Sequence, residues 1–250
     1  MARNARGGVL RAVGAFIITV TLTLLLALLA AVLALRWIDP PTSAFMLAAR
    51  FEAALQSDRR YQTDYQWRSL EQISPQAALA VIASEDQQFP YHAGFDFTSI
   101  RAAVRAHEQG ARLRGASTIS QQVAKNLFFW SGRSFIRKAL EALGTVMIET
   151  CWPKERILEV YLNVVEFGHG IYGVEAASRH FFRVPAARLT APQAALLAAV
   201  LPNPRRLHAE APSRYVLAQR DRILQQMANL GGPAYLRSIG PAENLRSRAN

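Results

Sequence analysis

Residues 84–96, SEDQQFPYHAGFD, carry a dense group of ionisable side chains directly after the apolar run AALAVIA. Glu85 falls at the C-terminal end of the helix that this apolar run predicts. The negative end of the helix dipole and burial beside apolar residues both disfavour a charged carboxylate, so both raise the pKa of Glu85. A general acid or base near neutral pH needs such a pKa. The stretch therefore predicts a catalytic carboxylate, and the alternative is a helix end that runs into a polar loop.

A second stretch, GASTISQQVAKN at 115–126, combines a glycine, neutral hydrogen-bonding side chains and a lysine. Ser117, Gln121 and Lys125 are spaced four residues apart, so a helix places them on one face with Gln122 beside them. This row suits a ligand that carries hydroxyl and phosphate groups. An amphipathic helix without a special role is the alternative.

The start of the same helix has its own signals. Thr118 and Gln121 have the spacing of a capping box. Gly115 allows close backbone approach, and a free helix N-terminus there can receive an anion. Ser117 has no lysine three residues later, which argues against a serine nucleophile.

The sequence RKALE places Arg137 and Lys138 four and three residues before Glu141, with Arg133 just upstream. This is either ordinary helix pairing or a charged site. Further on, YLNVVEFGHGIYGVEAAS has glycines at positions 168, 170 and 173, which suggest a tight loop packed against another segment.

The elements that position these residues are expected to be mostly helical, because strand signals are few. Ser74 followed by Pro75 predicts a capped helix start. The stretches expected to form helices are 43–56, 75–86, 97–109, 117–130, 134–152, 153–167, 174–182, 190–201 and 213–230.

Residues 12–35 form a run of 24 positions without a charge. A helix of this length spans a bilayer core of roughly 30 Å. The run ends in RWIDPP, which lacks the small-residue cleavage site of a secretory signal peptide, the alternative interpretation. Three arginines precede it, so the positive-inside rule predicts a cytoplasmic N-terminus. The expected division is 1–11 cytoplasmic, 12–36 transmembrane anchor and 43–250 outer domain.

The net charge of +11 leaves the part after the anchor with 25 basic against 18 acidic residues. A basic domain tethered at a membrane suggests anionic headgroups or a phosphate-bearing substrate. The anchor and its outward orientation argue against nucleic acid as a partner. Cys151 is the single cysteine, so no intramolecular disulfide is expected, and the five histidines lack metal-ligand spacing.

Five segments, in their order along the chain, resemble glycosyltransferase family 51, the peptidoglycan polymerases. They are EDQQFPYHAGFD, GASTISQQVAKNLF, RKALEALGTVMIE, KERILEVYLNVVEFGHGIYGVEAAS and AALLAAVLPNP. The resemblance covers residues 45–225, and its motifs are long and jointly specific. The chain lacks room for the transpeptidase domain of bifunctional members, so a monofunctional enzyme is expected.

The resemblance implies a mainly α, lysozyme-like domain with a small membrane-proximal lobe, besides the one N-terminal transmembrane helix. It implies lipid II as substrate, a disaccharide-pentapeptide on undecaprenyl pyrophosphate. The GlcNAc 4-hydroxyl attacks C1 of the MurNAc at the end of the growing strand, pyrophosphate leaves, and inversion forms a β-1,4 linkage. The expected location is the cell inner membrane, single-pass, with the catalytic domain periplasmic. The growing glycan strand, membrane lipid and cell-wall synthesis or divisome proteins are the expected partners.

The resemblance also assigns residues. Glu85 falls on the catalytic base, and Glu141 falls on a second catalytic glutamate that helps the departing pyrophosphate directly or through a cation. No cofactor is certain, and a divalent cation, Mg or Mn, is the candidate. The positions that match substrate-binding residues are Asp86, Phe89, His92, Gly115, Ser117, Thr118, Gln121, Gln122, Lys125, Asn126, Arg133, Arg137 and Lys138.

One electrostatic question stays open in the sequence. Lys125 and Arg133 would lower the pKa of Glu85 and so oppose the helix end and burial. The chain also departs from the family pattern at Ala116, where a second glycine is common, and at Ser120, where threonine is usual.

Two other functions are alternatives to polymerisation. A lytic muramidase or transglycosylase of the same fold relies chiefly on one acidic glutamate and needs no cationic pyrophosphate site. The row of Gln121, Gln122 and Lys125 with Arg133 favours synthesis over lysis. A non-catalytic scaffold of the cell-wall machinery is the other alternative, and the intact Glu85 and Glu141 argue against it.

Overall fold

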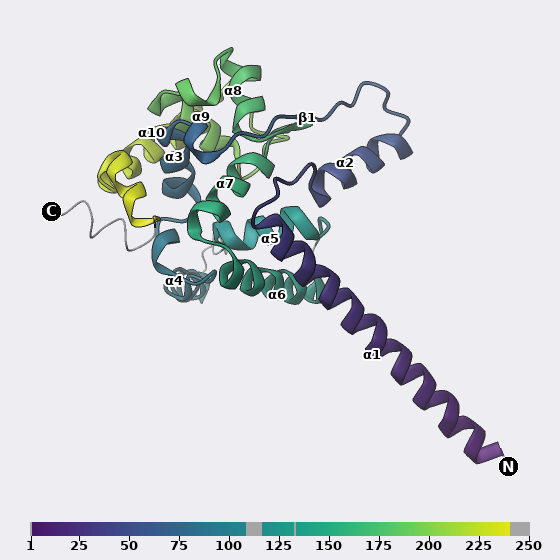
Figure 1. Cartoon of the computed structure of the whole chain (residues 1–250). Helices are drawn as coiled ribbons and strands as arrows, with labels where there is room; N and C mark the ends of the chain where they lie inside the picture. Colours follow the sequence, from purple (N-terminus) through teal and green to yellow (C-terminus); the bar gives the residue numbers. More distant parts are fainter. Residues whose placement is uncertain (1, 109–116, 133, 241–250) are drawn as a thin grey trace. The chain divides into compact units, whose positions relative to one another are not determined.

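The computed structural model describes residues 2–108, 117–132 and 134–240 (Figure 1). The chain divides into two compact units, Met1–Ile38 and Asp39–Asn250. The first unit contains α1, Ala2–Leu35. Within it, Arg11–Leu35 is long and apolar enough to cross a membrane, which is compatible with the predicted anchor.

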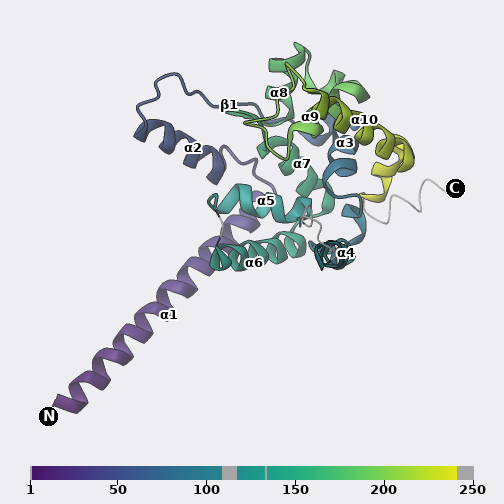
Figure 2. The same ribbon diagram turned by 180° about the vertical axis from the view of Figure 1, so that it is seen from behind.

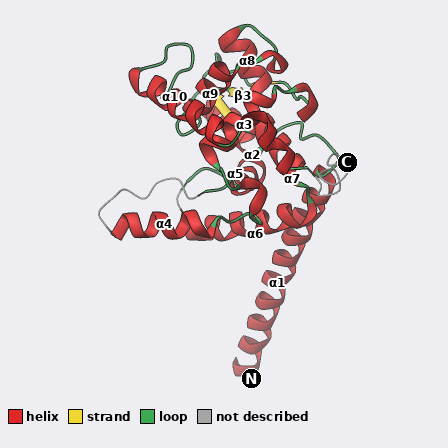
Figure 3. Ribbon diagram, turned by 90° about the vertical axis from the view of Figure 1, so that its left-hand side faces the viewer, coloured by secondary structure: helices red, strands yellow, loops and turns green. Residues whose placement is uncertain are grey.

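The second unit is mainly helical, as the sequence predicts (Figure 3). Its α-helices are α2 Ala44–Leu55, α3 Pro75–Glu85, α4 Phe97–Glu108, α5 Ile119–Phe128, α6 Phe135–Cys151, α7 Lys154–Val164, α8 Val174–Phe182, α9 Ala191–Val200 and α10 Arg214–Asn229. Short 3₁₀ helices are η1 Leu70–Gln72, η2 Phe89–Tyr91, η3 Ala186–Arg188 and η4 Gly232–Ser238.

Side-chain caps fix where the helices around the predicted site begin. Ser74 accepts a hydrogen bond from the Gln76 amide at the start of α3, and Pro75 is the first helical residue, as predicted. At the start of α5, Thr118 and Gln121 form the predicted capping box with both of its hydrogen bonds. Because the first residues of α3 and α5 are fixed by these caps, the helix face on which each following side chain lies is also fixed.

A small sheet of three strands joins distant parts of the second unit. The strands are β1 Asp64–Tyr65, β2 Glu166–Gly168 and β3 Ile171–Tyr172, in the order β1-β3-β2. β1 runs parallel to β3, and β2 pairs with β3 antiparallel through an irregular register. Strands of two or three residues are too short to show an alternating pattern, which is why the sequence did not predict them.

Helix α3 is the central element of the second unit. It packs against α9, α10 and η4, which lie together in Figures 1 and 2. Residues 77–83 are all buried, so α3 is apolar on every side because other elements surround it. A second group brings α5 against α6 and α7, with α2 also on α5. The predicted site residues within the described ranges come from the end of α3 and the loop after it, from α5 and the residues just before it, and from the first half of α6.

The predicted tight glycine loop is confirmed at Gly173. This residue has φ +83°, and a Cβ atom there would lie 2.5 Å from the Asn163 carbonyl oxygen. The Gly173 amide also donates to the Val165 carbonyl oxygen at 2.9 Å. The loop between β3 and α8 therefore passes directly over the end of α7.

We predict that Gly173→Ala strongly destabilises the protein. The left-handed backbone alone costs an alanine about 1–2 kcal/mol, and the contact with the Asn163 carbonyl raises the total loss to about 4 kcal/mol. Gly231→Ala is the matched control, because Gly231 has φ +87° and open space around its Cβ position. Thermal unfolding of both variants in detergent measures the difference, and equal losses would contradict the close approach.

Candidate active site

Glu85 is the last residue of α3, and its carboxylate is partly buried. The side-chain amide of Gln122 donates to Oε2 at 2.8 Å, and the Ser84 hydroxyl donates to Oε1 at 3.3 Å. Burial raises the pKa of Glu85, and these two hydrogen bonds and the Lys125 ammonium oppose the rise without cancelling it. The direction that the sequence left open is therefore upward.

Asp86, the next residue in the chain, is buried, and both of its carboxylate oxygens contact other groups of the protein. Its two oxygens lie 2.9 and 3.0 Å from His92 Nε2, and its Oδ2 accepts the Ile119 amide at 3.0 Å. The expectation of a free helix N-terminus at α5 is wrong, because this carboxylate already occupies it. A negative charge is stabilised there by the exposed amides and the helix dipole.

Thr118 and Gln121 are also buried and bonded locally. The Thr118 amide donates to Gln121 Oε1 at 3.0 Å, and the Gln121 amide donates to Thr118 Oγ1 at 3.2 Å. The Thr118 hydroxyl donates to the Gly94 carbonyl oxygen at 2.7 Å. These bonds connect the loop after Glu85 to the start of α5, while Ser117 just before it is exposed.

Two cavities adjoin these residues, and Ser117 lines both. The larger has a volume of about 880 Å³, and its lining includes Glu85, Asp86, His92, Ser117 and Thr118. The smaller has a volume of about 120 Å³ and is lined by Ser117, Gln121, Gln122, Lys125, Arg137, Lys138 and Glu141. Most of the predicted site residues that the structure describes therefore line one of two spaces with a shared wall.

The smaller cavity surrounds a buried carboxylate with cations. Glu141 Oε2 pairs with Arg137 Nη1 at 2.6 Å, and its Oε1 pairs with Lys138 Nζ. Glu141 is 3% exposed, so this is not an ordinary pair on a solvated helix face. Burial lowers the pKa of Lys125, and the Glu141 carboxylate opposes that change. Three basic side chains line the cavity against one acid.

Phe89 lies in the core, and its substrate role stays a prediction. Its ring has no exposed surface, and the Lys154 ammonium lies 4.5 Å from its centroid. A side chain in this position stabilises the loop after α3 by packing.

Asn126 is 6% exposed, and its substrate role stays a prediction. The predictions for Gly115, Ala116 and Arg133 lie outside the described residues.

Ser120, the second departure from the family pattern, faces the protein interior. It is buried and its hydroxyl donates to the Glu149 carboxylate, which also pairs with Lys154 at 2.7 Å. The residue therefore helps to connect α5 to α6 and α7.

Sequence reasoning missed two tyrosines that bond to this site. The Tyr161 hydroxyl donates to Gln122 Oε1 at 3.1 Å, and Tyr161 is fully buried. The Tyr235 hydroxyl, from η4, donates to the Gln87 carbonyl oxygen at 2.5 Å. Helical spacing of apolar residues marks Tyr161 as a core residue, but it carries no signal for the partner of a hydroxyl.

The charged residues do not assemble an evident cation site. Within the described ranges, no group of three or more His, Cys, Asp or Glu side chains has the arrangement to hold a metal ion. Both Glu141 oxygens are already in ion pairs. We therefore derive no step through a divalent cation.

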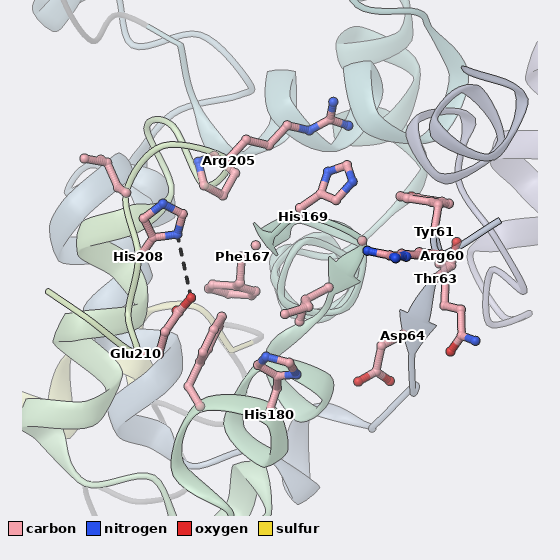
Figure 4. Close-up of a pocket in the computed structure, with 17 residues that line it drawn as sticks. Arg60, Tyr61, Thr63, Asp64, Phe167, His169, His180, Arg205, His208 and Glu210 are labelled. Atoms are coloured by element: carbon pink, nitrogen blue, oxygen red, sulfur yellow. Dashed lines mark ion pairs between the residues drawn. The ribbon is translucent and has the colours of Figure 1, made fainter. Parts of the chain in front are cut away.

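A third cavity, of about 580 Å³, lies in another part of the second unit (Figure 4). Residues from the segment before β1, the β2–β3 hairpin, α8 and the α9–α10 connection line it. Three of the five histidines are among them: His169, His180 and His208. His208 pairs with Glu210 at 3.7 Å. None of the predicted site residues that the structure describes lines this cavity.

Comparison with known proteins agrees with the site. The family model described as Transglycosylase matches residues 52–228. A biosynthetic peptidoglycan transglycosylase of Pectobacterium carotovorum is 50% identical over 94% of this chain and 97% of its own length. The corresponding protein of Cronobacter sakazakii is 56% identical over 78% of this chain and 81% of its own length. That of Ectopseudomonas mendocina is 54% identical over 87% of this chain and 90% of its own length. With a family match over most of its length and relatives at this identity, the chain belongs to the transglycosylase family and has its lysozyme-like fold.

Proposed function

We propose that this chain polymerises the glycan strands of peptidoglycan from lipid II, with Glu85 as the general base. The observation that carries the proposal is a carboxylate of raised pKa in a large cavity, next to a small cavity lined by three cations. The names of the relatives, biosynthetic peptidoglycan transglycosylases, support the same activity.

The proposed reaction is a single displacement. Glu85 takes the proton of the GlcNAc 4-hydroxyl as that oxygen bonds to C1 of the MurNAc, and the bond from C1 to the pyrophosphate breaks. Oε2 of Glu85 accepts from Gln122 at 2.8 Å, whereas the hydrogen bond of Oε1 within the described part of the chain is the longer 3.3 Å contact with Ser84. Oε1 is therefore the oxygen that we expect to receive the proton.

The leaving pyrophosphate gains negative charge, and we propose that the smaller cavity receives it. Lys125, Arg137 and Lys138 line this cavity and can stabilise that charge. Glu141 holds two of these cations through its ion pairs, so its proposed role is to position them. Lys138 is about half exposed, which leaves its ammonium able to reach a ligand.

A lytic enzyme of the same fold is the second candidate. A raised pKa suits the general acid of a lytic enzyme as well as the base of a polymerase, so Glu85 alone does not separate them. The cation-lined cavity favours synthesis, because a glycan substrate without phosphate has no use for it.

We also propose that α1 anchors the enzyme in the cell inner membrane, with the second unit on the periplasmic side. The apolar length of Arg11–Leu35 supports an anchor, and Arg11 lies at its N-terminal end. The second unit also exposes apolar side chains on α4 and α6, which suits contact with membrane lipid. These are Phe97, Val104, Phe135, Ile136 and Val146. Cell-wall synthesis and divisome partners stay a prediction.

We predict that Glu85→Gln lowers polymerisation by at least about 100-fold, because a neutral amide cannot accept the hydroxyl proton. Glu141→Gln should lower it by about tenfold or more, because Arg137 and Lys138 lose their partner. The assay incubates detergent-solubilised protein with labelled lipid II and separates the products on a gel, with and without muramidase. Glu71→Gln is the control, since Glu71 is exposed.

A muramidase-sensitive ladder from the wild type and from Glu71→Gln, but not from Glu85→Gln, supports the proposal. Near wild-type polymerisation by Glu85→Gln would show that another group is the base. Fragments released from preformed glycan, without a ladder, would favour the lytic enzyme.

We predict that the Glu85→Gln variant is more stable than the wild type at neutral pH. The pKa of Glu85 is higher in the folded chain than in the unfolded chain, so its ionisation disfavours folding. This loss of stability grows as the pH rises from the pKa of the unfolded chain through that of the folded chain. We expect Glu85→Gln to raise the Tm at neutral pH and the difference to vanish near about pH 4. Thermal unfolding across this pH range checks it, with Glu71→Gln unchanged. A lower Tm at neutral pH would mean that the variant loses activity by misfolding.

The membrane topology can be tested with reporters. A C-terminal alkaline phosphatase fusion should be active, because that enzyme matures only in the periplasm. An N-terminal fluorescent protein should be bright, since it folds in the cytoplasm. The opposite pattern would reverse the proposed orientation.

A further inference from the structure

A directional chain of hydrogen bonds leads from the core to Glu85. Tyr161 on α7 donates to the side-chain oxygen of Gln122 on α5 at 3.1 Å. The amino group of the same Gln122 side chain donates to Glu85 Oε2 at 2.8 Å. The oxygen and nitrogen of an amide differ in hydrogen-bonding role, so the partner of the oxygen decides which way the nitrogen points.

The Tyr161 hydroxyl is the donor in this chain, and Gln122 Oε1 is the acceptor. Burial, with the Glu85 and Asp86 carboxylates nearby, raises the pKa of Tyr161 well above its ordinary value, so the hydroxyl keeps its proton. Tyr161 has no exposed surface, and α7 packs against α5. Any effect of the hydroxyl on a bound substrate must therefore pass through Gln122.

We propose that Tyr161 is a positioning residue for Glu85, because its hydroxyl holds the Gln122 oxygen and so keeps the Gln122 amino group turned toward the carboxylate. This inference rests on the proposed function of Glu85 as the base. Without the hydroxyl, the bond to Glu85 alone holds the amide, and the Gln122 oxygen loses its buried partner. Orientations in which this oxygen turns toward the carboxylate and repels it then become more populated.

Other charged groups that face Glu85 limit how large this effect can be. Lys125 on α5 favours the ionised carboxylate, and Asp86 disfavours it. Tyr235 on η4 lies near Asp86. α9, which packs on α3, carries no ionisable residue. Tyr161→Phe leaves all of these in place, so it isolates the orientation of the amide.

The test compares Tyr161→Phe with the wild type by two readouts on the full chain in detergent. The first is the ¹³C titration of the Glu85 carboxyl group, assigned by its loss in Glu85→Gln. The second is the pH dependence of kcat for lipid II, measured together with KM. We expect the midpoint of the carboxyl titration and the midpoint of the kcat profile each to rise by about half a unit to one unit, a three- to tenfold change in the proton affinity of Glu85. KM should not change, because Tyr161 does not reach the substrate.

Tyr172→Phe is the matched control. Tyr172 is as deeply buried as Tyr161, and no hydrogen bond among the described residues joins its hydroxyl to Gln122 or Glu85. This variant should lose a similar amount of buried polar surface and keep the wild-type titration of Glu85.

A double-mutant cycle tests whether Tyr161 acts through Gln122. If it does, Gln122→Ala raises the midpoint of the Glu85 titration, and adding Tyr161→Phe to that variant changes nothing further. Additive shifts would overturn the inference. The inference would also be overturned if Tyr161→Phe has the same Tm as Tyr172→Phe and Glu85 still titrates in it as in the wild type.

The two readouts separate this inference from the proposed function. If Tyr161→Phe shifts the carboxyl titration while Glu85→Gln still polymerises lipid II, Tyr161 positions Glu85 but Glu85 is not the base. If Glu85→Gln is inactive and Tyr161→Phe shifts neither readout, the base stands and the positioning role is wrong.

Discussion

The Asp86 carboxylate holds the site together, because it joins two segments that the sequence keeps apart. It accepts the Ile119 amide at the start of α5 and lies against His92 in the loop that follows α3. The dipole and the N-terminal amides of α5 stabilise the negative charge of Asp86, in addition to its contact with His92. Because the start of α5 is held there, Gln122 comes within 2.8 Å of the Glu85 carboxylate. This contact, together with the bond from the Thr118 hydroxyl to the Gly94 carbonyl oxygen, helps to fix the position of Glu85 relative to the cation-lined cavity.

Three acidic side chains of the site have the same chemical group in different surroundings. Asp86 has its oxygens filled by an amide and an imidazole, and Glu141 has each oxygen filled by a cation. Glu85 has one neutral amide and one long hydroxyl contact. Burial without a full set of strong partners leaves Glu85 with a raised pKa and an oxygen available for a proton. The environment therefore distinguishes the proposed base from the two carboxylates that hold other groups in place.

Local patterns predicted much of this arrangement, and long-range contacts account for the rest. The helix starts at Ser74 and Thr118 were predictable because capping involves residues two or three apart. The end of α3 near Glu85 followed from the apolar run, but the direction of the pKa change of Glu85 did not, because it depends on how Lys125 and the hydrogen bonds weigh against burial. The occupant of the α5 N-terminus was not predictable, since Asp86 lies 33 residues from Ile119. The Tyr161 hydroxyl bonds a residue 39 positions away, and its side chain reads in sequence only as part of the core.

The proposed reaction depends on Glu85, a partly buried glutamate of raised pKa, which removes the proton from the incoming sugar. The pH dependence of the initial rate of lipid II polymerisation by the wild-type protein in detergent tests it most directly. We expect a rate that rises with pH as a single group ionises, with a midpoint above the ordinary glutamate pKa of about 4.3. A rate that is constant from about pH 4 upward, or a midpoint at or below that value, would contradict it.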